Sequence, residues 1–125
     1  MQKLQRKKFD FDQIQTVLQQ LTDEKLLNNT RFVTHYIDYR RNRGYGPLHI
    51  RAELMARGIQ KEMIEHHLLI NDNVWQECVK DVWLKRFKNQ IPVDFKARVK
   101  QMRYLQQRGF TQEQIEHFYL KILAI

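Results

Sequence analysis

The sequence contains few of the residues that break helices or cross-link chains. Its 125 residues include four glycines, two prolines and one cysteine. A lone cysteine, Cys78, excludes an internal disulfide, and the apolar stretches are far shorter than the ~20 residues needed to span a bilayer. No basic start followed by an apolar stretch marks a signal peptide. We therefore expect a soluble cytoplasmic protein that spans no membrane.

Charge of one sign is in excess. Lysine and arginine number 22 against 14 for aspartate and glutamate, which gives a formal net charge of +8. Such a surface favours anionic partners, namely nucleic acid, acidic proteins or nucleoprotein. Residues 80–103 hold eight basic residues against Asp81 and Asp94. A solvated helix face explains each single lysine adequately, but it does not explain the excess of positive charge over the whole chain.

The apolar residues follow a helical period. They recur at spacings of three and four, as in the stretch from Phe32 to Ile37. No strong alternating pattern typical of strands occurs, so the sequence predicts an all-α protein. The expected helices cover residues 29–43, 47–57, 61–70, 72–88, 93–108 and 112–123.

The pattern also repeats along the chain. Phe9, Ile59 and Phe110 stand 50 and 51 residues apart, and two further triplets keep this register: Ile14, Ile64, Ile115 and Leu4, Leu54, Leu105. A period of about 50 residues indicates a repeated supersecondary unit. We expect units of three helices that pack on their neighbours into an elongated, curved array. The predicted divisions are a partial first unit (1–24), a second (25–71) and a third (72–125).

Each copy carries similar helix-terminating residues. Gly58 and Gly109 are suited to the left-handed conformation that closes a helix. Thr111 and Gln114 have the spacing of a capping box, whereas Gln60 at the equivalent position is a poor cap. The other expected caps are Asp10, Asn28 or Asn29, and Asn71 or Asp72.

The stretch RNRGYGPLHIRAELMARGI, residues 41–59, forms a joint between two expected helices. Gly44 fits a helix stop, Gly46 removes a side chain at a tight bend, and Pro47 fits the first turn of the next helix. Tyr45 is suited to filling the gap between the helices. Three arginines near the preceding helix end complement its dipole: Arg40, Arg41 and Arg43. A well-formed helical corner is the simpler interpretation of these features.

This joint resembles the signature of the RecX family of bacterial recombination regulators, in which an R-x-R-G-Y-G-P-x-x-I-R-x-E-L-x-x-x-G-I block lies in the middle unit. The resemblance continues upstream through LTDEKLLNNTRFVTHYIDYRR (21–41) and downstream through Trp75, Lys80 and Arg108, so it covers nearly the whole chain. Family members begin with a fuller first unit, and Met1 stands where its second helix is under way. The matching residues are Arg41, Arg43, Gly44, Tyr45, Gly46, Pro47, Ile50, Arg51, Glu53, Leu54, Gly58 and Ile59.

The resemblance implies tandem three-helix units and a regulatory role. RecX-like proteins bind the RecA recombinase and its filaments on single-stranded DNA, and they restrain strand exchange, ATP hydrolysis and the co-protease activity that triggers the SOS response. We expect a monomer without enzymatic activity, cofactor or metal, and weak nonspecific binding to DNA. The candidate contacts to RecA or DNA are Arg40, Arg41, Arg43, Tyr45, Arg51, Arg57, Lys85, Arg86, Lys88, Arg98 and Arg103. The expected structural residues of the joints are Gly44, Gly46, Pro47, Gly58 and Gly109.

A basic DNA-binding protein that acts without RecA is the alternative. The joint is also compatible with a helix-turn-helix that has His49, Arg51 and Glu53 at the start of a recognition helix. Its turn is richer in glycine and proline than that motif needs, and no dimerisation element is visible. Sequence-specific binding to duplex DNA would distinguish this function.

Enzymatic activity has weaker support. His66, His67 and Cys78 are the material for a metal site, but adjacent histidines on a helix point about 100° apart. His117 recurs at the repeat position of His66, which favours a packing or surface role. No phosphate-binding loop, nucleophile motif or ligand cluster occurs.

Overall fold

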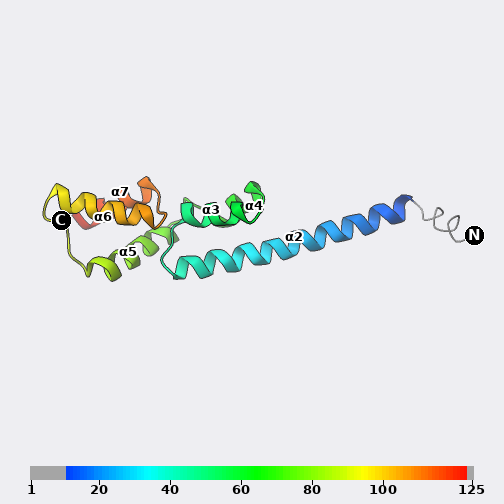
Figure 1. The fold of residues 1–125 in the computed structure, drawn as a ribbon, viewed down its shortest axis with the longest axis horizontal. Coiled ribbons are helices and arrows are strands. Elements are labelled where there is room, and N and C mark those ends of the chain that lie inside the picture. Colours follow the sequence, from blue (N-terminus) through cyan, green and yellow to red (C-terminus); the bar gives the residue numbers. More distant parts are fainter. Residues whose placement is uncertain (1–10, 124–125) are drawn as a thin grey trace, which may run out of the picture. The chain divides into compact units, whose positions relative to one another are not determined.

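Residues 11–123 are described by a computed structural model, and every element in this range is a helix (Figure 1). The prediction of an all-α fold is confirmed, and five of the six expected helices agree with the structure to within two residues at each end. The helices are α2 (Phe11–Asn42), α3 (Pro47–Ala56), α4 (Lys61–Leu68), α5 (Val74–Phe87), α6 (Phe95–Gln107) and α7 (Gln112–Leu123).

Helix α2 corrects one expectation. It runs without a break through Asn28 and Asn29, so the predicted helix start and cap at these residues are wrong. The segment around them contains no glycine or proline, and asparagine inside a helix costs only about 0.7 kcal/mol relative to alanine. The amide of Gln19 also donates to Asp23 Oδ1 at 2.9 Å, four residues further along α2. Two local asparagines therefore do not outweigh a long helix-forming segment.

The chain divides into two compact units between Phe32 and Val33. In the first unit, Ile14 and Val17 are exposed. Of the repeat positions predicted there, Leu4 and Phe9 lie outside the described residues, as does the cap predicted at Asp10.

The second unit contains the hydrophobic core. Helices α5, α6 and α7 pack on one another, and α3 packs on α4 (Figure 1). Trp75 and Trp83 on α5 are both buried, which confirms that they are core residues. Trp75 Nε1 donates to the carbonyl oxygens of Leu68 and Leu69 at 3.2 and 3.1 Å, so it joins α5 to the end of α4.

The predicted repeat is visible in the burial pattern of the second unit. Leu54 and Leu105 are both fully buried, and so are Ile64 and Ile115 one helix later in each copy. His66 and His117, also equivalent in the repeat, are both exposed. The two copies therefore turn the same positions toward the core.

The helix ends follow the expected turn chemistry. Gly58 and Gly109 have φ of +84° and +102°, so both adopt the left-handed conformation that closes α3 and α6. Thr111 Oγ1 accepts a hydrogen bond from the Gln114 amide, and Gln114 Oε1 accepts one from the Thr111 amide, at 3.0 and 2.9 Å. This is the predicted capping box. Gln60, as expected, forms no side-chain cap.

Candidate partner-binding surface at the basic joint

The joint between α2 and α3 lies against a turn from the next repeat. The Gly46 amide donates to the Arg108 carbonyl oxygen at 2.7 Å, and the Leu48 amide donates to the Gly109 carbonyl oxygen at 2.9 Å. A Cβ atom at Gly46 would lie 2.4 Å from the Gly109 carbonyl carbon. Glycine is therefore required here by contact between two backbones, rather than by a local bend alone.

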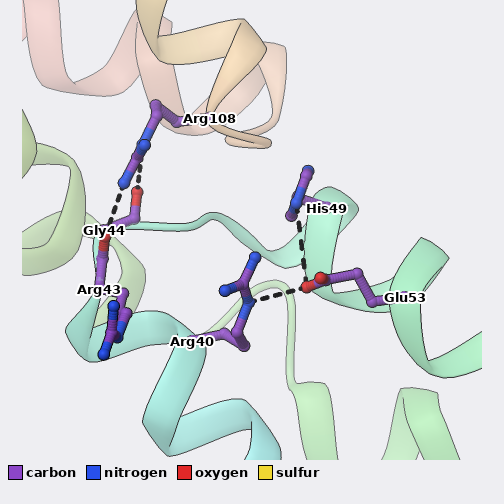
Figure 2. A network of polar contacts seen from close by, with 6 residues as sticks. All are labelled: Arg40, Arg43, Gly44, His49, Glu53 and Arg108. Carbon is purple, nitrogen blue, oxygen red and sulfur yellow. Dashed lines mark hydrogen bonds and ion pairs between the residues drawn. The ribbon is translucent and has the colours of Figure 1, made fainter.

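Arg108 holds the joint from the α6 side. Its Nε donates to the Gly44 carbonyl oxygen at 3.0 Å, and its Nη2 donates to the Arg43 carbonyl oxygen at 2.6 Å, as Figure 2 shows. The same guanidinium lies 4.1 Å from the centre of the Tyr45 ring. Sequence reasoning did not select Arg108 as a site residue, although the Arg-Gly pair at 108–109 repeats the pair at 57–58.

Tyr45 is a structural centre of the joint. Arg40 lies 3.9 Å from its ring centre, and the His49 ring stacks on it at 4.7 Å with planes 16° apart. The half-buried tyrosine fills the gap between helices, as one interpretation of the sequence proposed. Arg40, His49 and Arg108 therefore surround its ring.

Three of the candidate arginines form ion pairs within the fold. Arg40 Nε lies 3.0 Å from Glu53 Oε1, and the same oxygen lies 3.9 Å from His49 Nε2 (Figure 2). Arg51 forms a two-pronged pair with Glu65 at 2.7 and 3.0 Å, which ties α3 to α4. A third pair, at 2.9 Å, joins Arg41 to Asp38 on the surface of α2.

A basic cleft of about 740 Å³ lies between the end of α2, α5 and the end of α6. Among the described residues, its lining includes one carboxylate, Asp81, and five cationic side chains: Arg41, Arg43, Lys85, Arg86 and Arg108. Four of these five are among the residues predicted to bind a partner. Arg43, Lys85 and Arg86 are exposed, so their charge is available to a ligand. We call this set of residues the basic cleft.

The remaining candidates lie elsewhere. The Arg57 guanidinium is 5.0 Å from the Tyr36 ring centre, and the half-buried Arg98 is 5.8 Å from that of Tyr119. Lys88 is exposed at the end of α5 in a left-handed conformation, and Arg103 is exposed on α6. The structure therefore gathers only part of the predicted set into one place.

Burial raises the pKa of two side chains near the joint and the basic cleft. Burial and then a hydrogen bond with Glu53 raise the pKa of Tyr36 above its ordinary value. Burial also raises the pKa of the Cys78 thiol, which lines the basic cleft. A thiol with a raised pKa is mostly protonated at neutral pH and is a poor nucleophile.

Within 11–123, no three histidine, cysteine, aspartate or glutamate side chains lie close enough together to hold a metal ion. Over the same range, no helix is both long enough and apolar enough to cross a membrane. His67 Nδ1 instead lies 2.9 Å from the Met63 carbonyl oxygen within α4.

The fold and the cleft define an all-α protein of tandem three-helix repeats with a cationic surface where two repeats meet. Residues 28–68 match the second three-helix domain of RecX, and residues 76–118 match the third. Regulatory protein RecX of Pseudomonas fluorescens (strain SBW25) is 38% identical over 113 residues, which are 90% of this chain and 73% of that protein. The RecX protein of Pseudomonas tolaasii has the same identity and coverage.

A relative from another genus matches the chain at a similar identity. Regulatory protein RecX of Yersinia enterocolitica (serotype O:8, biotype 1B) is 38% identical over 106 residues, or 85% of this chain and 64% of that protein. The chain belongs to the RecX family, which is a family of regulatory proteins.

Proposed function

We propose that this chain regulates the RecA recombinase by binding RecA and its filament on single-stranded DNA, and that it inhibits strand exchange, ATP hydrolysis and co-protease activity. Membership of the RecX family supports the regulatory role. The observation that carries the binding proposal is the basic cleft, where five cations from two repeats surround one carboxylate among the described residues. Phosphates of the bound DNA, or acidic side chains of RecA, are its expected ligands.

We divide the candidate residues by their contacts within the fold. Arg43, Lys85 and Arg86 are exposed in the cleft and are the proposed contacts. Arg40 and Arg51 are each paired with a glutamate inside the fold, and replacing them would disturb the joint itself. Arg108 supports the joint through two carbonyl oxygens and also lines the cleft.

The helix-turn-helix alternative gains no support from the start of α3. His49 stacks on Tyr45, and both Arg51 and Glu53 form ion pairs with other elements of the fold. Side chains that read base edges must be available to hydrogen-bond those edges. We therefore favour nucleoprotein binding over sequence-specific recognition of duplex DNA.

The test is RecA's ATP hydrolysis on single-stranded DNA while the chain is titrated in. The triple variant Arg43→Ala, Lys85→Ala, Arg86→Ala should need at least about tenfold more protein for half inhibition, because each lost charge contact weakens binding severalfold. A matched control, Lys61→Ala, Lys80→Ala, Lys121→Ala, removes the same charge from exposed positions outside the cleft. It should inhibit like the original chain.

Binding to a single-stranded oligonucleotide without RecA completes the design. Losing three phosphate contacts should make the negative slope of log affinity against log salt less steep by about 2. If the original chain fails to inhibit RecA, or inhibits only when it coats the DNA, the proposed function is wrong. If both triple variants inhibit equally, the cleft is not the contact.

A further inference from the structure

A second surface, beside the basic cleft, combines exposed apolar side chains with cations. The segment that joins α5 to α6 carries Val93, which is 93% exposed, and Ile91, which is also exposed. Phe95, the first residue of α6, is 80% exposed and lines a groove of about 840 Å³ along α5 and α6, together with Phe87, Val99 and Tyr104 among others. We call this surface the Phe95 groove.

Hydrogen bonds hold the backbone on the N-terminal side of Phe95 in place. Asp94 Oδ1 accepts a hydrogen bond from the Ala97 amide at 2.7 Å, which caps α6 immediately before Phe95. The amide of Gln101 donates to the Gln90 carbonyl oxygen at 2.9 Å and anchors the other end of the segment. Large apolar side chains that are rigidly exposed together typically mark an interaction site.

The rim of the Phe95 groove is cationic. Lys96, Lys100 and Arg103 follow one another at spacings of four and three on α6, so they share a face, and Arg86 contributes from α5. No ion pair with any of the four is found among the described residues, and the nearby Asp94 carboxylate serves as a helix cap. Among the described residues that line the groove, four cations stand against one carboxylate, so its apolar surface lies within an excess of positive charge.

We propose that the Phe95 groove docks an acidic segment of a protein partner that carries one bulky apolar side chain. The apolar group would cover Phe95 and Val93, and the flanking carboxylates would meet the cations of α6. The identification of this partner as RecA rests on the proposed function. The preference of the groove for an acidic, apolar segment rests on its own lining residues. Since Arg86 lines both surfaces, the chain would engage the protein and the nucleic acid of a filament side by side.

Other occupants fit less well. Proteins bind single-stranded DNA by stacking successive bases on several aromatic rings. Phe95 offers one exposed ring, but Ile91 and Val93 are aliphatic, and the Phe87 and Tyr104 rings already meet edge to face at 5.6 Å. A second copy of the chain, paired through the same face, would bring the two sets of cations together. An acidic peptide satisfies both the apolar surface and the charge.

The first arm of the test uses designed probes and an isotopically labelled chain observed by NMR. A short peptide of glutamates around a central phenylalanine should shift the backbone amide signals of Phe95, Val99 and Arg103. The same peptide with serine in place of phenylalanine should bind about tenfold more weakly, as should the first peptide with the variant Phe95→Ser. Leu120→Ser, which removes an apolar side chain that is 65% exposed on α7, is the matched control and should leave binding unchanged.

The second arm measures binding to RecA filaments and to naked single-stranded DNA. Phe95→Ser should lower affinity for the filament about tenfold and leave affinity for the oligonucleotide unchanged. The proposal is overturned if the peptide shifts no amide in the groove, if Phe95→Ser weakens DNA binding instead, or if it abolishes self-association seen by sedimentation. If the chain binds the peptide in the groove but neither binds nor inhibits RecA, the proposed function is wrong and this inference still holds.

Discussion

Replacing Gly46 by alanine tests the idea that the joint is built on contact between two backbones. Gly46 has φ of −88° and ψ of 173°, a conformation that any residue adopts without strain. The substitution therefore adds no backbone penalty, and its cost comes from the added methyl group alone. That group would lie 2.4 to 2.5 Å from three backbone atoms of Gly109 and Phe110, which cannot rotate away as a side chain can.

The magnitude follows from the hydrogen bonds at this contact. To relieve the clash, the joint must move away from the 108–110 turn, which breaks the bonds from the Gly46 and Leu48 amides at 2.7 and 2.9 Å. Each buried polar group left without a partner costs about 1–3 kcal/mol, so we expect a loss of about 2–6 kcal/mol in the free energy of unfolding. This is a large share of the ~5–15 kcal/mol that typically stabilises a domain.

Gly58→Ala provides the matched control. Gly58 has φ of +84°, but no atom lies within 4 Å of the position of its missing Cβ. Its substitution should cost only the left-handed backbone penalty of about 1–2 kcal/mol. The assay is urea unfolding followed by tryptophan fluorescence, because Trp75 and Trp83 are both buried in the same unit. If Gly46→Ala destabilises the chain no more than Gly58→Ala does, the backbone contact is not what requires glycine.

Two further predictions concern the buried polar cluster under α6. Trp83 Nε1 and the Tyr119 hydroxyl both donate to Gln101 Oε1 at 2.9 Å. Gln101→Leu removes this acceptor and should lower the free energy of unfolding, measured by urea unfolding, by about 2–5 kcal/mol. An unchanged urea midpoint would contradict this role of Gln101. Burial raises the pKa of Tyr119 from 10.0 to about 12, so the folded state holds the phenolic proton more tightly and stability falls as pH rises from 10 to 12. At most about 2.7 kcal/mol of the free energy of unfolding is lost in that interval. The free energy of unfolding of the original chain should therefore fall by up to this amount relative to that of Tyr119→Phe. If the gap between the two proteins does not change with pH, the raised pKa of Tyr119 is wrong.

The helices of the second unit were predictable because their determinants are local. Apolar spacing, the left-handed glycines and the Thr111–Gln114 box all lie within a few residues of the features that they specify. The continuity of α2 differs from the prediction, in which Asn28 or Asn29 caps a helix that begins there. Asparagine favours helix caps statistically, but without a glycine or proline beside it the helix continues.

The candidate site was harder to predict, since its contacts join residues far apart in the sequence. Arg40 and Arg51 pair with glutamates 13 and 14 positions away, and nothing local distinguishes them from unpaired surface arginines. Arg108 reaches Gly44, 64 positions away, and was not selected at all. Net charge predicted that cations contribute to binding. Only the fold separates the cations that stabilise the joint from those that are exposed in the basic cleft.

The position of Arg108 links the stability of the joint to the shape of the basic cleft. Its guanidinium satisfies the carbonyl oxygens of Arg43 and Gly44, and it also lines the cleft beside Arg43. Cations from the end of α2 and from α5 are thus brought to one cleft only while the joint lies on the turn after α6. The two glycines that permit this close approach, Gly46 and Gly109, would therefore support the proposed binding indirectly, although neither carries charge. In this chain, the geometry of a turn and the charge of a surface are one structural requirement.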